Sequence, residues 1–167
     1  MDRRVMQRPT NHQTTVICLH SSASTGGQWA ALRAQLEPGV RVLTPDFHGH
    51  GAGPAWQGTD QDIVAFDAAR IARLVESVPG GVHLVGHSYG AALLLEAART
   101  LGERVKSLTL VEPSLFHLLR GRPEWAEVQT LARAVLGAVA RGDDRAAAKS
   151  FMTYWLGRWR WWLSPER

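Results

Sequence analysis

One stretch of sequence, residues 82–101, constrains the fold of this chain more than any other. A short apolar run at 82–85 predicts a buried strand, and apolar residues from 91 to 101 recur at helical spacing. Between them lies Gly86-His87-Ser88-Tyr89-Gly90, a G-x-S-x-G sequence with the serine at the apex of a sharp turn. The two glycines remove side chains that would collide in so tight a bend, and free amides at the start of the helix would face an oxyanion beside Ser88. The alternative is a glycine-rich turn with an incidental serine.

The same alternation of strand and helix runs through most of the chain. Apolar, β-branched runs at 14–19, 40–45 and 105–111 predict further strands. A helix is expected over 59–78, beginning at a capping box formed by Thr59 and Asp62 and ending at Pro79-Gly80-Gly81. Trp29, Leu32 and Leu36 mark another helix face. This order predicts a parallel sheet with right-handed crossovers.

Three further motifs follow strands in a recognisable order. They are His20-Ser21-Ser22 after the first strand, the Asp46–Gly53 loop after the second, and Glu112-Pro113 after the last. With the serine turn, they make residues 14–118 resemble the N-terminal part of an α/β-hydrolase. The resemblance implies an α/β fold, a three-layer sandwich with a mostly parallel sheet whose last strands are absent. It also implies one incomplete domain over 1–167, with core elements over about 14–118 and cap-like helices over about 119–167.

The resemblance assigns roles to several residues. Ser88 would be the nucleophile, and the backbone amides of Ser22 and Tyr89 would stabilise the oxyanion. Ser21 occupies the position where the family usually has glycine. We expect His20 to be a structural residue that ties this loop down.

A general base for Ser88 is difficult to find in the sequence. The family places its acid and then its histidine after the serine, and the only later histidine is His117. His117 is therefore the candidate base and Glu112 the candidate acid. His87 is a poor base, because successive side chains in the turn point in different directions. His48 and His50 are expected to be loop histidines, since no ligand cluster accompanies them, and neither metal nor cofactor is predicted.

Two more helices are predicted after residue 123, over about 125–139 and 145–156. The family has its helical cap here, which would form an apolar channel and exclude water. Two helices that pack on the core without a gate are the alternative. The tryptophan-rich tail, 157–167, is expected to pack as part of a cap that truncation leaves unfinished, and a membrane-surface tail is the alternative.

Composition narrows the classes of function. The net charge is +4 and the sequence pI is about 10, but the arginines are scattered and form no basic stripe, so nucleic acid is not an expected partner. The sequence has no apolar run of about 18 residues and no apolar segment after its charged N-terminus, which predicts a soluble cytoplasmic protein without membrane attachment. The single cysteine, Cys18, is expected to be a small buried side chain.

The leading hypothesis is a serine hydrolase that acts on an ester or related small-molecule acyl substrate with an apolar part. The alternative is a truncated, catalytically inactive fragment or pseudo-enzyme that lacks the histidine of the triad. For these 167 residues alone we expect little or no turnover. A third hypothesis is a split enzyme completed by another chain. An unpaired sheet edge would also favour self-association.

Overall fold

The computed structural model describes residues 14–57 and 63–157. The chain divides into two compact units, Met1–Ser114 and Leu115–Arg167. The sequence placed the end of the core elements near Leu118, whereas the structure groups residues 115–118 with the C-terminal helices. Phe116 packs there against Trp155 with tilted rings, whose centroids are 5.9 Å apart.

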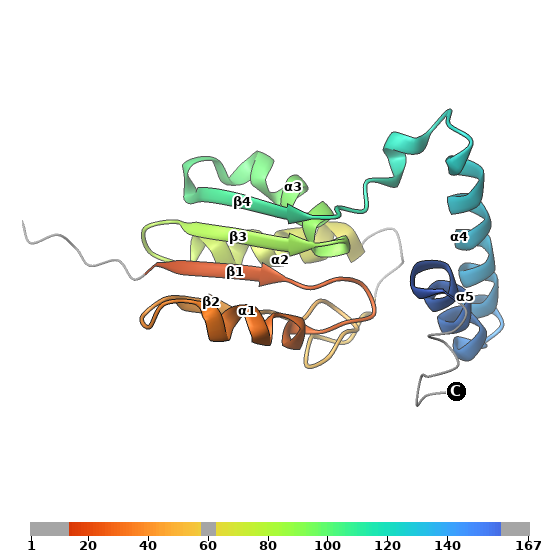
Figure 1. Cartoon of the computed structure of the whole chain (residues 1–167), viewed down its shortest axis with the longest axis horizontal. Coiled ribbons are helices and arrows are strands. Elements are labelled where there is room, and N and C mark those ends of the chain that lie inside the picture. Colours follow the sequence, from red (N-terminus) through yellow and green to blue (C-terminus); the bar gives the residue numbers. More distant parts are fainter. Residues whose placement is uncertain (1–13, 58–62, 158–167) are drawn as a thin grey trace, which may run out of the picture. The chain divides into compact units, whose positions relative to one another are not determined.

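The first unit contains a sheet of four parallel strands in the order β2-β1-β3-β4 (Figure 1). The strands are β1 (Thr15–Leu19), β2 (Arg41–Leu43), β3 (Val82–His87) and β4 (Val105–Val111). Leu19 pairs with Gly86, and His87 pairs with Val111. The carboxyl ends of β1, β3 and β4 therefore meet at one edge of the sheet, where parallel α/β folds form their sites.

Helices cover both faces of this sheet and make the expected three layers. A short 3-10 turn, η1 (Gly26–Trp29), leads into α1 (Ala30–Gln35) on one face. Helices α2 (Ile63–Glu76) and α3 (Tyr89–Leu101) lie on the other (Figure 1). The expected start of α2 at Thr59 and Asp62 lies outside the described residues. The α/β-hydrolase-like fold class predicted from the sequence is confirmed.

Alternate side chains of the strands enter two separate cores. On the α2 and α3 side, Ile17 and Leu84 are fully buried against apolar residues of both helices. On the α1 side, Val16 and Cys18 pack with Trp29 and flanking apolar residues. Cys18 is buried, as expected from the sequence, and this burial raises the pKa of its thiol to about 11.

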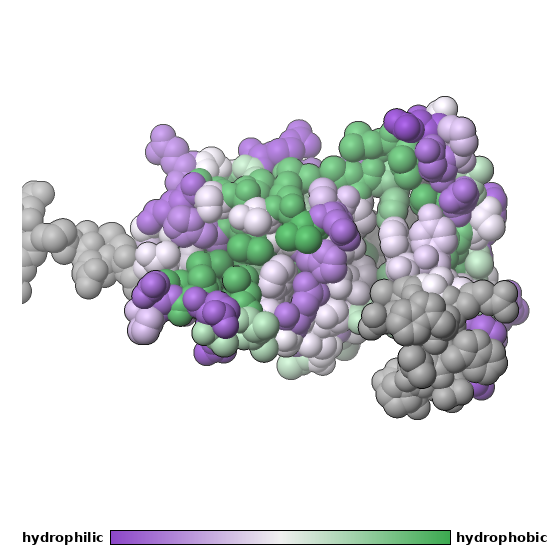
Figure 2. Space-filling view, viewed as in Figure 1, coloured by the Kyte–Doolittle hydropathy of each residue, from purple (hydrophilic) through white to green (hydrophobic). Residues whose placement is uncertain are grey.

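Strand β4 is covered less completely than β1. Its Leu108 and Leu110 pack against the larger core, but Ser107, Thr109 and Val111 are exposed. Apolar and weakly polar residues share this accessible face over β3 and β4 (Figure 2). Among the described strands, β4 pairs only with β3, so one of its edges has no strand beside it there.

The second unit is a helical hairpin preceded by the turn η3 (Phe116–Leu119). Helix α4 (Glu124–Ala140) and helix α5 (Asp144–Leu156) match the two helices predicted from sequence. Gly142 has a φ of +71°, and the Asp143 side chain caps α5 by accepting from the Ala146 amide at 2.9 Å. The tryptophans at 159, 161 and 162 lie outside the described residues. Within the described part, no helix is long and apolar enough to cross a membrane.

Candidate active site

The serine predicted to react lies at a strained position between β3 and α3. Ser88 has φ +53° and ψ −114°, a conformation that L-residues seldom adopt and that costs roughly 1–3 kcal/mol. It is the N-cap residue of α3, and its carbonyl accepts the first helical hydrogen bond, from Ala92 at 3.0 Å. The sharp strand-to-helix turn predicted from the sequence is therefore present.

The two glycines of the turn are required by close contacts. A Cβ on Gly86 would lie 2.7 Å from the backbone nitrogen of Ala91, inside the turn itself. A Cβ on Gly90 would lie 2.6 Å from the Leu19 carbonyl oxygen and 2.7 Å from that of His20. Gly90 thus allows the start of α3 to approach the end of β1. This brings the loop after β1 close to the turn at residues 86–90, which forms a nucleophile elbow (the elbow).

The backbone of β4 and of the segment after it holds Ser88 in place. The Ser88 amide donates to Val111 O at 2.9 Å, and Ser114 N donates to Ser88 O at 3.3 Å. The hydroxyl oxygens of Ser88 and Ser114 are 3.5 Å apart. Among the residues that the structure describes, no histidine or carboxylate hydrogen-bonds to Ser88 Oγ. The described hydrogen-bond partners of Ser88 therefore include no group that could act as its general base.

His20 anchors the loop after β1, as expected from the sequence. Its Nδ1 donates to the Ser21 carbonyl at 2.8 Å, and its Nε2 accepts from the Phe47 amide at 3.3 Å. These partners require the neutral ring with its proton on Nδ1. Burial lowers the pKa of His20, which favours the same neutral form. His20 therefore joins two loops as a neutral ring.

Asp46 makes a second link between the same loops. Its carboxylate accepts from the amides of Gly26, at 2.6 Å, and Ala52, at 2.8 Å. These two backbone hydrogen bonds lower the pKa of Asp46, with the bond from Gly26 contributing most. Gly51, with φ +49°, faces this carboxylate closely, since a Cβ there would lie 2.3 Å from Asp46 Oδ2.

A buried carboxylate on α2, which was not identified from the sequence, supports the residue after the serine. Asp67 is 1% exposed and accepts from Tyr89 Oη at 3.1 Å and from His48 Nδ1 at 2.7 Å. Burial raises the pKa of the Tyr89 phenol, so it remains a neutral donor. A sequence signal existed: Asp67 lies midway between Ile63 and Ile71 at i, i+4 spacing, on the apolar face of the helix.

The remaining histidines of this region are loop histidines, as expected. His48 donates from both its ring and its backbone amide to Asp67, and His50 Nδ1 lies 2.9 Å from the His48 carbonyl. No group of three metal-ligating side chains occurs within residues 14–57 and 63–157.

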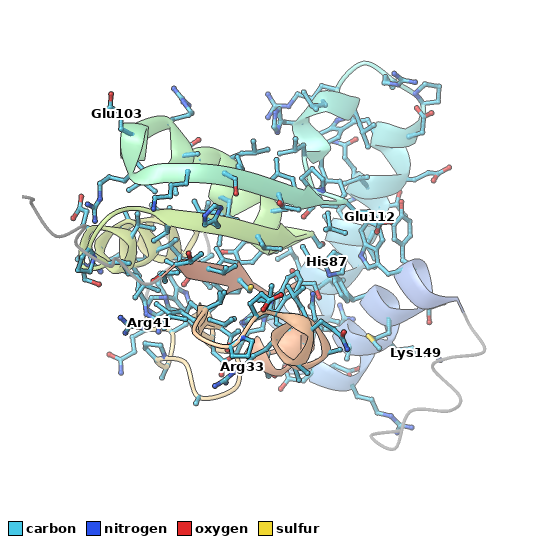
Figure 3. The ribbon with its side chains drawn as sticks, turned by 60° about the vertical axis from the view of Figure 1, so that its left-hand side comes forward. Arg33, Arg41, His87, Glu103, Glu112 and Lys149 are labelled. Atoms are coloured by element: carbon cyan, nitrogen blue, oxygen red, sulfur yellow. The ribbon has the colours of Figure 1, made fainter. Side chains whose placement is uncertain are left out.

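The candidate acid and base fall in different units. Glu112 follows β4 with φ +45°, is exposed, and lies at the same sheet edge as His87 (Figure 3). His117 is an exposed residue of η3 in the second unit. The roles of both residues remain predictions. His87 Nδ1 hydrogen-bonds to Gln28 Nε2 at 3.1 Å, which agrees with the view that His87 is a poor base for Ser88.

The second unit has a groove of its own between α4 and α5. Its volume is about 840 Å³, and apolar residues such as Leu131, Ala134 and Ala146 line it together with Glu127 and Lys149. The apolar side chains of α4 are half-buried or exposed, apart from Ala138, which is the one buried residue of this helix among those described.

The elbow, the loop after β1 and the parallel sheet define a class of protein. The sequence model of the alpha/beta hydrolase family matches residues 16–167. The chain therefore belongs to the alpha/beta hydrolase family.

Two of the similar proteins are an esterase and a lipase. The chain is 35% identical over 96 residues to a pimeloyl-[acyl-carrier protein] methyl ester esterase of Methylococcus capsulatus, covering 58% of this chain and 35% of that protein. It is 30% identical over 115 residues to the lipase LipV of Mycobacterium tuberculosis, covering 69% and 43%. The chain thus spans less than half the length of either relative.

Solved structures agree on the fold. An esterase from Exiguobacterium antarcticum superimposes with a TM-score of 0.64 at 22% identity, covering 83% of this chain and 52% of that one. A thioesterase domain from the curacin biosynthetic pathway gives a TM-score of 0.54 at 32% identity, covering 60% and 36%.

Proposed function

We propose that this chain carries the nucleophilic half of a serine hydrolase that acts on esters or related acyl compounds. The observation that carries the proposal is the strained conformation of Ser88 at the N-terminus of α3. Such a turn exposes a hydroxyl group beside unbonded helix amides, and its strain is retained only because β4 and the two glycines hold it. The esterase, lipase and thioesterase names of the similar proteins support the substrate class.

In the proposed reaction, Ser88 Oγ attacks the carbonyl carbon and loses its proton to a base. The carbonyl oxygen becomes an oxyanion and accepts from the amides of Ser22 and Tyr89. Neither amide donates to an acceptor within the described residues, so both are available to a ligand. Collapse of the intermediate expels the alcohol or thiol and leaves an acyl-enzyme, which water then hydrolyses.

The donors would act mainly on the transition state. An oxyanion forms only as the carbonyl is attacked, so donors placed for it raise kcat more than they lower KM. Loss of one such donor typically costs about 3–4 kcal/mol of barrier. The proposal also assigns Glu112 as the acid and His117 as the base.

A catalytically inactive chain is the second candidate, and one observation favours it. Ser88 Oγ has only Ser114 Oγ as a hydrogen-bond neighbour in the described part, and a hydroxyl group cannot act as the general base. In that case the elbow would at most bind an acyl ligand.

Hydrolysis of short p-nitrophenyl esters by the wild-type chain and by Ser88→Ala separates the two candidates. The proposal expects turnover that the substitution removes, and His117→Gln would then show whether His117 supplies the base. The inactive candidate expects a folded wild-type chain, by circular dichroism, that hydrolyses no faster than Ser88→Ala. Turnover that survives in Ser88→Ala would contradict the assignment of the nucleophile.

A further inference from the structure

One side chain links the loop after β1 to the elbow, and the proposed reaction does not yet use it. Gln28, in η1, accepts with Oε1 from the Ser21 amide at 3.0 Å and from Ser21 Oγ at 3.1 Å. Its Nε2 donates to His87 Nδ1 at 3.1 Å. His87 immediately precedes Ser88, so a single amide group connects the two segments that would surround the oxyanion.

The orientation of this amide follows from its partners. The Ser21 backbone N–H can only donate, so the atom facing it must be the oxygen of Gln28. The amide nitrogen then faces His87, whose Nδ1 must accept and whose proton therefore lies on Nε2. Gln28 thus fixes both the loop after β1 and the tautomer of the His87 ring. An apolar side chain of the same length could form neither hydrogen bond.

The loop depends on such side-chain contacts because Ser21 stands where glycine is usual in this family. The Ser21 carbonyl is held by His20 and the Ser21 amide by Gln28. The next residue, Ser22, supplies the amide expected to bind the oxyanion, and Ala23 follows with φ +54°. The side chains of the adjacent His20 and of Gln28 in η1 therefore fix both polar groups of the Ser21 backbone, which leaves the Ser22 amide in a set position with its hydrogen free.

We propose that Gln28 is a positioning residue, which holds the Ser22 amide at the correct distance from Ser88 by bridging Ser21 to His87. This inference rests on the proposed function, because only an acyl-transfer reaction needs that amide. Ser88 itself is held independently, by Val111 and Ser114 and by the close approach at Gly90. Loss of Gln28 would therefore displace one donor and leave the nucleophile in place.

The substitution Gln28→Met tests this, since methionine has a similar length and cannot bridge the two partners. Gln35→Met is the matched control, because Gln35 is an exposed glutamine at the end of α1, on the neighbouring helix. For Gln28→Met we expect kcat to fall by roughly tenfold to a hundredfold, with KM and the urea midpoint near their wild-type values. A displaced donor should have a smaller effect than a deleted one, for which the loss is about 100- to 1000-fold. A general loss of structure would instead move the urea midpoint.

A second measurement does not depend on turnover. In ¹H–¹⁵N NMR spectra, His87 Nδ1 should have the shift of a hydrogen-bonded acceptor, and the Ser21 amide should exchange slowly with water. Gln28→Met should remove the first feature and accelerate the second at least severalfold, while Gln35→Met should change neither.

The outcomes separate the two proposals. If the wild-type chain turns over, an unchanged kcat or an unchanged Ser21 exchange rate in Gln28→Met overturns the positioning role. If the wild-type chain does not turn over, the proposed function fails as stated and the NMR measurement decides on the link. Faster Ser21 exchange then supports Gln28 as the residue that fixes the loop, and wild-type exchange overturns it.

Discussion

The two units of this chain differ in how much apolar surface they bury. The sheet unit encloses side chains from both faces of β1 and from α2 and α3, many of them fully buried. In the helical unit only Ala138 and Ala147 are buried among the described residues. Five large apolar side chains of that unit are exposed: Leu118, Leu136, Val139, Tyr154 and Trp155. Burial of apolar surface is the main driving force of folding, so the sheet unit has much the larger source of stability.

This difference predicts unequal responses to loss of a leucine side chain. Leu84→Ala removes a fully buried side chain from the sheet unit and should lower the free energy of unfolding by about 2–5 kcal/mol. Leu136→Ala removes a side chain that is 55% exposed and should change it by less than about 0.5 kcal/mol. Urea unfolding followed by circular dichroism measures both. Comparable losses would show that the helical hairpin is packed as tightly as the sheet.

Replacing one glycine in each unit by alanine should change the free energy of unfolding in opposite directions. Gly90→Ala places a Cβ within 2.7 Å of two backbone oxygens, so the elbow must shift and the chain should lose about 1–3 kcal/mol. Gly137→Ala, inside α4, meets only the flexible end of Arg141 at 3.4 Å. Alanine is the better helix former, so this variant should gain about 0.5–1 kcal/mol. Thermal unfolding of both variants beside the wild type gives the signs, and a neutral Gly90→Ala would contradict the close contact at the elbow.

Acid should weaken the sheet unit through His20. The pKa of His20 is lowered in the fold, so the unfolded chain binds a proton more readily, and stability falls as the pH drops below about 6.5. Asp46, whose pKa is also lowered, stays ionised there, and its contribution is lost only in stronger acid. Urea midpoints at pH 7.5 and 5.5 therefore compare the chain above and below the pH at which His20 begins to destabilise the fold. In His20→Gln the urea midpoint should change less between the two pH values than it does in the wild type. A change as large as that of the wild type would assign the effect to other groups.

The smallest effect concerns the edge of the sheet. Self-association through β4 was expected from the sequence and remains a proposal, supported by the absence of a second strand beside β4 in the described part. Thr109→Lys adds a charge to this exposed strand and should reduce any concentration-dependent dimer. Sedimentation velocity at several concentrations measures it. Thr130→Lys, at an exposed position of α4, is the control that should leave association unchanged.

The sequence predicted the secondary-structure elements well, because each depends on the spacing of apolar residues over a short segment. The strand predicted at 105–111 has those ends in the structure. The helix predicted over 125–139 is one residue longer at each end and runs from Glu124 to Ala140. The contacts that support the candidate site were not predicted. Asp67 and Tyr89 are 22 residues apart, and Gln28 and His87 are 59 apart, so no local pattern relates them.

The sequence by itself determined the place of the sharp turn that carries Ser88, since G-x-S-x-G lies between an apolar strand and a helix. It also determined the parallel sheet, because strands alternate with helices along the chain. Only the tertiary structure decided how that turn is supported. The start of α3 lies against the end of β1 at Gly90, and hydrogen bonds of Asp67 and Gln28 converge on the residues beside Ser88. Side chains far apart in sequence meet only when the sheet aligns the strand ends, and that alignment is a property of the whole fold.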